Sequence, residues 1–206
     1  MNSEQGRILR RTKGFYYVQA PGGGEVECKA KGSLFRAGRP ESHIAVGDLV
    51  RYDPEALRIQ EILPRKSFLS RSRVGVETRQ ILAANVDYLL ITASVVEPPF
   101  RPMLVFRLLT AAWIGSVAPC VVITKTDLAR PGEVAALAAP FEAMGLEVLP
   151  SSIEDREPNP RLHEILLSGA CVLAGHSGAG KSSLLNRHFP GLSLKVGGVA
   201  RNGLPA

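Results

Sequence analysis

The sequence is poor in cysteine and has no long apolar run. Its three cysteines, Cys28, Cys120 and Cys171, lie far apart and never in a CxxC spacing, which argues against a disulfide framework or a zinc knuckle and predicts reduced, partly buried thiols. The longest apolar stretches, Tyr88 to Val96 and Val117 to Ile123, are far shorter than the ~20 residues of a membrane-spanning helix. No apolar segment follows the basic N-terminal residues, so no secretory signal is indicated and a cytoplasmic protein is expected.

Acidic residues are scarce in the first part of the chain. Residues 1–79 hold 15 Lys and Arg against 9 Asp and Glu, whereas residues 80–206 hold 10 of each. The whole net charge of +6 therefore lies in residues 1–79. Such an asymmetry predicts a polyanion partner for this part, with nucleic acid ahead of a membrane because no basic amphipathic helix is visible. The alternative is a solvated basic surface.

Residues 6–63 alternate in the manner of short β-strands separated by glycine-rich turns. The clearest runs are 14–18, 25–28, 44–52 and 57–63. About five strands in ~60 residues is the size of a closed OB-type barrel, a fold that commonly binds nucleic acid. An SH3-like barrel stays open as an alternative. We assign this domain to residues 1–66.

A basic, serine-containing stretch follows and interrupts the apolar pattern, so residues 67–80 are predicted to be a linker. The candidate RNA contacts in this stretch and just before it are Arg65, Lys66, Arg71 and Arg73, because arginine suits phosphate and base contacts. From residue 81 to 206 the pattern is α/β, which implies a parallel sheet. Apolar runs at 86–93, 119–124, 146–149 and 170–174 alternate with helical segments near 103–114, 132–144 and 160–168.

The strongest motif begins where the apolar run 170–174 ends. Residues 175–182 satisfy GxxxxGK[ST] at every fixed position, the pattern of a phosphate-binding P-loop. The glycines allow backbone N–H groups to turn inward, Lys181 offers a charge to the phosphates, and the Ser182 hydroxyl can bind Mg²⁺. The expected phosphate-binding residues are Gly175, His176, Ser177, Gly178, Ala179, Gly180, Lys181, Ser182 and Ser183. A glycine-rich turn without a ligand is the alternative.

A second motif, TKxD, follows the apolar run 119–124. The Asp127 carboxylate can accept hydrogen bonds from the N1–H and the exocyclic amine of guanine, and the Lys125 stem can lie along the ring. The next strand ends in Ser151 and Ser152, whose N–H groups could bind the guanine carbonyl oxygen. Each pattern alone is weak, but the strand ends of a parallel sheet meet at one edge, where α/β folds bind ligands. The predicted guanine-binding residues are Thr124, Lys125, Asp127, Ser151 and Ser152.

The base-reading segments precede the P-loop, an order opposite to that of ordinary small GTPases. Together with Val46-Gly47-Asp48-Leu49-Val50, Leu63-Pro64-Arg65-Lys66-Ser67 and the run from His176 to Asn186, this order resembles the circularly permuted GTPases that help to mature the small ribosomal subunit, the RsgA/YjeQ type. The resemblance implies an OB barrel before a circularly permuted P-loop GTPase domain, GTP or GDP with Mg²⁺ as cofactors, hydrolysis stimulated by the small ribosomal subunit, and rRNA binding by the barrel. We expect a monomer with no membrane partner.

The sequence also departs from this family. Thr124 stands where asparagine is commoner, and His176 where glutamine is. The family continues with a switch threonine, a DxPG segment and a zinc-binding Cys/His domain, whereas 25 residues follow Lys181 and residues 165–206 contain no Asp or Glu. We therefore expect a GTPase domain that is incomplete at its C-terminus and lacks the zinc ligands, and we assign no catalytic residue. The alternatives are a non-hydrolysing RNA- and nucleotide-binding remnant and an ATP-using P-loop enzyme in which Asp127 does not read the base.

Overall fold

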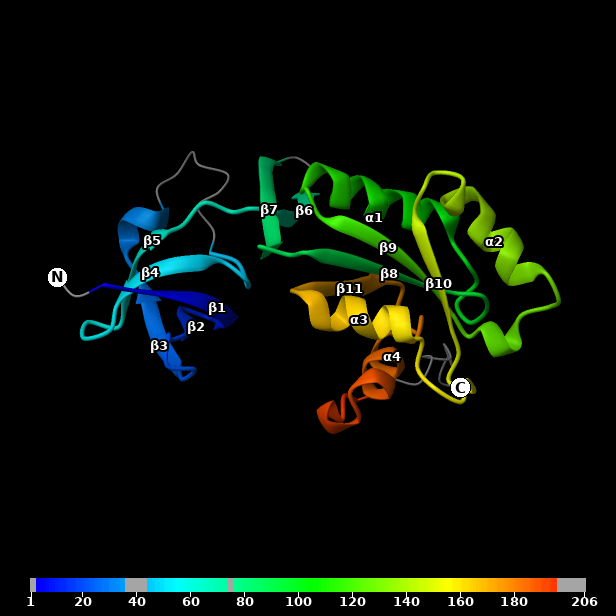
Figure 1. Cartoon of the computed structure of the whole chain (residues 1–206). Coiled ribbons are helices and arrows are strands. Elements are labelled where there is room, and N and C mark those ends of the chain that lie inside the picture. The colour runs from blue at the N-terminus through cyan, green and yellow to red at the C-terminus, as the bar shows by residue number, and fades with distance from the viewer. Residues whose placement is uncertain (1–2, 36–43, 74–75, 196–206) are drawn as a thin grey trace, which may run out of the picture. The chain divides into compact units, whose positions relative to one another are not determined.

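The computed structural model describes residues 3–35, 44–73 and 76–195. It divides the chain into two compact units, which Figure 1 shows as ribbons. Unit 1 comprises Met1–Asp87 with Ile114–Val117, and unit 2 comprises Tyr88–Trp113 with Ala118–Ala206. Among the described residues, no helix has both the length and the hydrophobicity needed to cross a membrane.

Unit 1 contains a closed five-stranded barrel with the strand order β1-β2-β3-β5-β4. Its strands are β1 (Glu4–Thr12), β2 (Phe15–Gln19), β3 (Glu25–Ala30), β4 (Leu49–Asp53) and β5 (Arg58–Ile62), with a 3₁₀ turn η1 (Gly32–Phe35) after β3. Alternate residues of each strand point inward, so that Ile8, Val18, Tyr52 and Ile59 are at most 1% exposed. The β3–β5 pairing is parallel and the others are antiparallel. The predicted OB-type barrel is confirmed.

The segment expected to be a linker forms a hairpin instead. Strands β6 (Phe68–Arg73) and β7 (Val76–Ala84) pair antiparallel. Ile81, Ala84 and Phe68 pack with Ala45 in a small apolar cluster, and this burial holds the hairpin within unit 1. The expected boundary after residue 66 therefore differs from the observed one, which follows Asp87.

Unit 2 is a parallel four-stranded sheet with the order β10-β9-β8-β11. Its strands are β8 (Tyr88–Ser94), β9 (Ala118–Thr124), β10 (Glu147–Ser151) and β11 (Cys171–Gly175). Its helices are α1 (Pro102–Ile114), α2 (Glu133–Glu142), α3 (Pro160–Ser168) and α4 (Lys181–His188), with 3₁₀ turns η2 (Thr126–Leu128) and η3 (Pro190–Leu192). The predicted alternation of strands and helices, and the parallel sheet, are confirmed.

Helices cover both faces of this sheet. In Figure 1, α1 and α2 lie on one face, where the rings of Phe106 and Phe141 are 5.4 Å apart. On the other face, Leu162 of α3 and Leu184 of α4 pack against Leu90 of β8. Such two-sided burial is typical of a parallel sheet, and it explains why its strands are almost continuously apolar.

Parallel pairing brings four strand ends to one edge. Ser94 of β8 and Ser151 of β10 are both in register with Thr124 of β9, and Gly175 of β11 is in register with Thr92 of β8. The loops that carry the predicted motifs therefore leave the sheet at the same edge.

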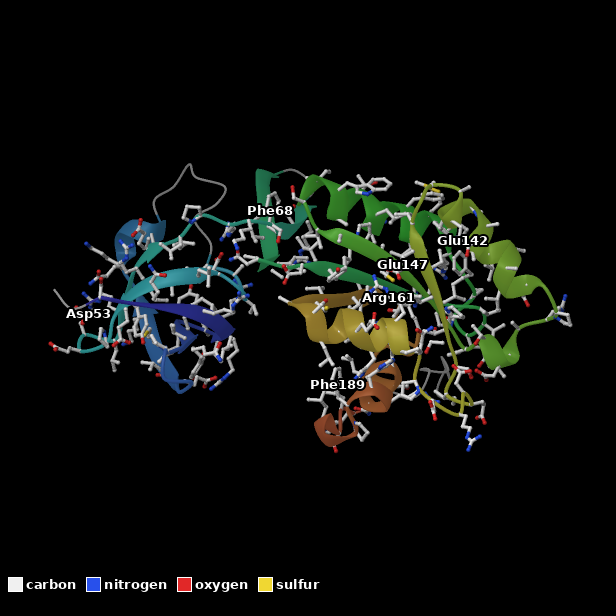
Figure 2. The ribbon with its side chains drawn as sticks, in the orientation of Figure 1. Asp53, Phe68, Glu142, Glu147, Arg161 and Phe189 are labelled. Atoms are coloured by element: carbon white, nitrogen blue, oxygen red, sulfur yellow. The ribbon has the colours of Figure 1, made fainter. Side chains whose placement is uncertain are left out.

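An exposed ion pair joins helix α3 to the opposite end of β10. Figure 2 shows Arg161 reaching from α3 to Glu147 at the start of that strand, where Arg161 Nε lies 2.6 Å from Glu147 Oε1. Both side chains are exposed, so we expect this pair to stabilise the fold only slightly.

Candidate nucleotide-binding site

The loop between β11 and α4 has a backbone that glycine favours. Gly178 and Gly180 have φ angles of +81° and +82°, in the left-handed region that side chains rarely adopt. A Cβ atom added at Gly175 would lie 2.0 Å from the carbonyl oxygen of Thr92. The loop can therefore approach β8 only because residue 175 is glycine.

Lys181 spans this loop from the first turn of α4. Its Nζ donates hydrogen bonds to the carbonyl oxygens of Gly175, at 3.1 Å, and His176, at 2.7 Å. Partial burial lowers the pKa of the Lys181 ammonium from its ordinary value. Ser182 and Ser183 occupy the same first turn, where helix N–H groups favour a bound anion. The His176 side chain is exposed, and its Nδ1 lies 2.9 Å from the Ser177 carbonyl oxygen.

Thr124 joins the TKxD segment to the P-loop. Its hydroxyl donates a 2.8 Å hydrogen bond to the carbonyl oxygen of Ala179, and both residues are buried. The two motifs predicted separately from the sequence are therefore in direct contact.

The end of β10 lies beside the segment that the sequence predicts to bind the base. The Ser152 hydroxyl donates a hydrogen bond of 2.5 Å to Asp127 Oδ1. Lys125 has a left-handed φ of +58°, and its Nζ donates to the carbonyl oxygen of Glu97. Ser152 is buried and Asp127 is exposed. The carboxylate is therefore oriented from within while its outer side is open.

The N–H groups of Ser151 and Ser152 are not free for a ligand in the way that the sequence predicts. Ser151 is a paired residue of β10. The N–H of Ser152 donates to Asp155 Oδ2 at 2.8 Å, so it is already engaged. The next N–H, that of Ile153, bonds no acceptor within the part of the chain that the structure describes. Ile153 was not predicted from the sequence because a backbone donor leaves no mark in the residue type. Asp155 was not predicted because its bond to the Ser152 N–H forms only in the folded loop.

The predicted RNA contacts fall into three groups. Arg65 binds Asp48 through two hydrogen bonds of 2.7 and 2.8 Å, and its side chain is only 10% exposed while that of Asp48 is 0% exposed. Arg65 is therefore part of the barrel and not an open RNA contact. Lys66 and Arg71 are exposed, and Arg71 Nε donates to Gln80 Oε1 at 3.0 Å. The side chain of Arg73 lies outside the described part of the structure.

The thiols are placed as expected. Cys28 and Cys120 are buried and Cys171 is half-buried, all three without a disulfide. Burial raises the pKa of Cys28 to about 11 and that of Cys120 to about 12. Within the described residues, no three His, Cys, Asp or Glu side chains gather into a cation site. Ser182 stays the candidate Mg²⁺ ligand.

The sequence and the structure were compared with known proteins. The RsgA GTPase family model matches residues 62–203, and the RsgA N-terminal domain matches residues 5–58. The small ribosomal subunit biogenesis GTPase RsgA of Shouchella clausii is 32% identical over 204 residues, which are 96% of this chain and 65% of that protein. The protein of the same name from Bacillus cereus is 34% identical over 202 residues, which are 95% of this chain and 64% of that protein. The chain thus spans slightly less than two thirds of these relatives.

Two solved structures have a similar fold. YjeQ from Thermotoga maritima has a TM-score of 0.73 and 26% identity, covering 94% of this chain and 68% of that chain. YloQ, described as a circularly permuted GTPase, has a TM-score of 0.68 and 27% identity, covering 92% of this chain and 66% of that chain. The family match, the permuted order of the motifs and their meeting at one sheet edge agree, and the chain belongs to the RsgA GTPase family.

Proposed function

We propose that this chain binds GTP and GDP at the carboxyl edge of the unit 2 sheet and hydrolyses GTP during maturation of the small ribosomal subunit. The observation that carries the proposal is the hydrogen bond between Thr124 and Ala179, at 2.8 Å. It joins a loop suited to phosphate to a loop suited to guanine. The names of the relatives support the choice of the ribosomal subunit as partner.

The phosphates would bind the P-loop. Except for the Ala179 N–H, which donates to the His176 carbonyl oxygen at 3.2 Å, the backbone N–H groups of the P-loop and of the first turn of α4 would form an anion-binding surface. Lys181 would exchange its two carbonyl partners, Gly175 and His176, for phosphate oxygens. Ser182 would hold Mg²⁺, a fit consistent with the preference of that ion for few protein oxygens, completed by phosphate and water. When bound, Mg²⁺ neutralises charge on the transferred phosphoryl group.

Guanine would bind between Asp127 and the loop after β10. The Asp127 carboxylate, oriented by Ser152, accepts from the N1–H and the exocyclic amine of the base. The Ile153 N–H donates to the guanine carbonyl oxygen in place of the serine N–H groups predicted from the sequence. Adenine has an amine at that carbonyl position and no N1–H, so it would leave the Asp127 carboxylate and the Ile153 N–H without partners.

A competition titration tests the nucleotide site. Fluorescently labelled GDP is bound to the whole chain with Mg²⁺ and displaced by GDP, GTP or ATP. We expect both guanine nucleotides to displace it, and ATP to need at least about 100-fold more, because adenine would leave the Asp127 carboxylate and the Ile153 N–H without partners. Lys181→Ala should abolish binding, while Lys195→Ala, an exposed control, should not. Equal displacement by ATP would contradict the guanine site.

The ribosomal part of the proposal is tested separately. Unit 1 would bind rRNA through Lys66, Arg71 and Arg73, as its excess of basic residues suggests. The double variant Lys66→Gln, Arg71→Gln should bind an rRNA fragment more weakly. Its affinity should also depend less steeply on salt concentration, by the amount expected for the loss of about two phosphate contacts. Arg51→Gln with Arg58→Gln, in the barrel strands β4 and β5, is the matched control. GTP hydrolysis measured with and without small subunits should rise when the subunits are present. We place this activity in the cytoplasm and in a monomer.

A further inference from the structure

Arg187 links the helix of the P-loop to the loop that follows β10. It is the seventh of the eight residues of α4, and its terminal nitrogen Nη1 donates a 2.7 Å hydrogen bond to the carbonyl oxygen of Ile153. Its Nε is buried and has no partner among the described residues. Arg187 is therefore half-buried: its Nε lies unpaired in the interior, which is costly, and one terminal nitrogen bonds the base-reading loop.

The loop after β10 depends on such polar contacts. Ile153 is 65% exposed, so its side chain does not anchor the loop by burial. The bonds made by Ser152, to Asp127 and to Asp155, stay within the base-reading side of the site. The bond from Arg187 differs because it comes from the phosphate-binding side.

Helix α4 places the two ends of this link at a fixed separation. Lys181 begins the helix within the P-loop, and Arg187 lies six residues further along, which corresponds to about 9 Å of rise. A helix of this length with Leu184 buried in the sheet core moves as a unit. A phosphate bound at the start of α4 and the Ile153 carbonyl oxygen would therefore both contact the same rigid helix.

We propose that Arg187 is a positioning residue for guanine: by holding the Ile153 carbonyl oxygen from α4, it fixes the backbone at Ile153. It thereby directs the N–H of that residue, which belongs to the preceding peptide, toward the carbonyl oxygen of a base whose phosphates lie on the P-loop. The proposal rests on the proposed function, since it assigns guanine to this loop. Arg187 does not touch the base in this assignment. Its effect is confined to the part of the nucleotide that Ile153 reads.

Three nucleotides separate this role from a general structural one. GDP and inosine diphosphate both carry the carbonyl oxygen and the N1–H, inosine lacks only the exocyclic amine that Asp127 accepts, and ADP has neither the carbonyl oxygen nor the N1–H. Dissociation constants are measured for the whole chain, for Arg187→Met, which keeps the apolar stem, and for Arg187→Lys, which keeps a donor. Arg107→Met, on the exposed side of α1, is the matched control. Thermal unfolding of each variant reports whether it is folded.

Arg187→Met should weaken the binding of GDP and of inosine diphosphate by the same factor, about fivefold, and leave the affinity for ADP unchanged. Such an effect is expected for a residue that acts without touching the ligand. Arg187→Lys should recover part of the loss. If the variant weakens the binding of all three nucleotides alike, or of GDP alone, Arg187 does not position the backbone of Ile153 and the proposal is wrong. If the unaltered chain shows no preference for GDP over ADP, the proposed function itself fails, and that result is distinct from either of the others. If Arg187→Met does not fold, the comparison is made with Arg187→Ala, which also lacks the donor, and an unchanged ratio of GDP to ADP affinity in that variant would overturn the proposal.

Discussion

The hydroxyl of Thr124 donates a hydrogen bond to the carbonyl oxygen of Ala179, 55 residues further along the chain. The bond is buried and lies between the end of β9 and the P-loop. It explains how a threonine can stand where related proteins more often have asparagine: the hydroxyl still reaches the P-loop. The TKxD segment and the P-loop are therefore joined directly by a short side chain.

Replacing Thr124 by valine should loosen that junction. The variant has almost the same shape but leaves the Ala179 carbonyl oxygen unpaired and buried, which should lower the free energy of unfolding by about 1 kcal/mol and weaken GDP binding by about fivefold. Thr124→Ser should restore both. Thr110→Val removes a similar hydroxyl from the exposed side of α1 and should change neither. Urea unfolding and GDP titration measure the two effects.

Gly175 of the P-loop can be compared with Gly132, which precedes α2, to test how closely the P-loop backbone packs. Both have a positive φ, but a Cβ at Gly175 would meet the Thr92 carbonyl oxygen at 2.0 Å, whereas nothing lies within 4 Å of one at Gly132. Gly175→Ala should therefore cost more than about 3 kcal/mol of unfolding free energy, and Gly132→Ala about 1–2 kcal/mol from backbone strain alone. Equal losses in urea unfolding would show that the loop does not pack against β8 as described.

The sequence predicted most of unit 2 because local signals agree with the fold there. Helix α3 begins at Pro160, and the Asn159 side chain accepts a hydrogen bond from the Leu162 N–H, the start signal that such residues provide. The hairpin β6–β7 was missed because its first strand has apolar side chains only at Phe68 and Leu69, followed by serines and arginines. Its burial against Ala45 is a long-range contact that no local pattern reports.

The candidate site shows the same division. The P-loop could be predicted because its backbone requires glycine at fixed positions, and Asp127 because it follows a buried strand. Ile153 could not, since any residue type provides an N–H. Arg65 was expected to be an RNA contact because only its charge is visible in the sequence. Its partner Asp48 lies 17 residues earlier, and their pairing is a property of the folded barrel.

Arg65→Met should therefore destabilise the barrel. It leaves Asp48, which is fully buried, without its charged partner, a change that typically costs about 3–5 kcal/mol. Arg51→Met breaks the exposed pair with Glu61 and should cost less than about 1 kcal/mol. Urea unfolding of the two variants gives the comparison. Equal, small losses would show that the Asp48 carboxylate does not depend on Arg65.

The histidine at the end of α4 predicts a pH dependence. Burial lowers the pKa of His188, and the neighbouring His163 and Arg187 lower it further. In the unfolded chain a histidine titrates near about 6.5, so the unfolded state binds the proton more readily. The contribution of His188 to stability is therefore complete above about pH 6.5 and is lost as the pH falls toward the lowered pKa of the folded state.

Unfolding in urea at several pH values between about 5 and 7.5 measures this loss. His188→Gln should reduce the loss of stability on acidification, because glutamine does not titrate. His176→Gln, at an exposed position of the P-loop, should leave it unchanged. The same acid-dependent loss in both variants would assign it to other groups.

The proposed reading of guanine by Asp127 is tested most directly by exchanging its carboxylate for an amide. Dissociation constants for GDP and for xanthosine diphosphate are measured with the whole chain, with Asp127→Asn and with the exposed control Glu157→Gln. An amide can donate to the extra carbonyl of xanthine but cannot accept from both donors of guanine. Asp127→Asn should therefore weaken GDP by about 100-fold and strengthen xanthosine diphosphate, so that the preference reverses while the control keeps it. An Asp127→Asn variant that still binds GDP as tightly as the unaltered chain would contradict the guanine site.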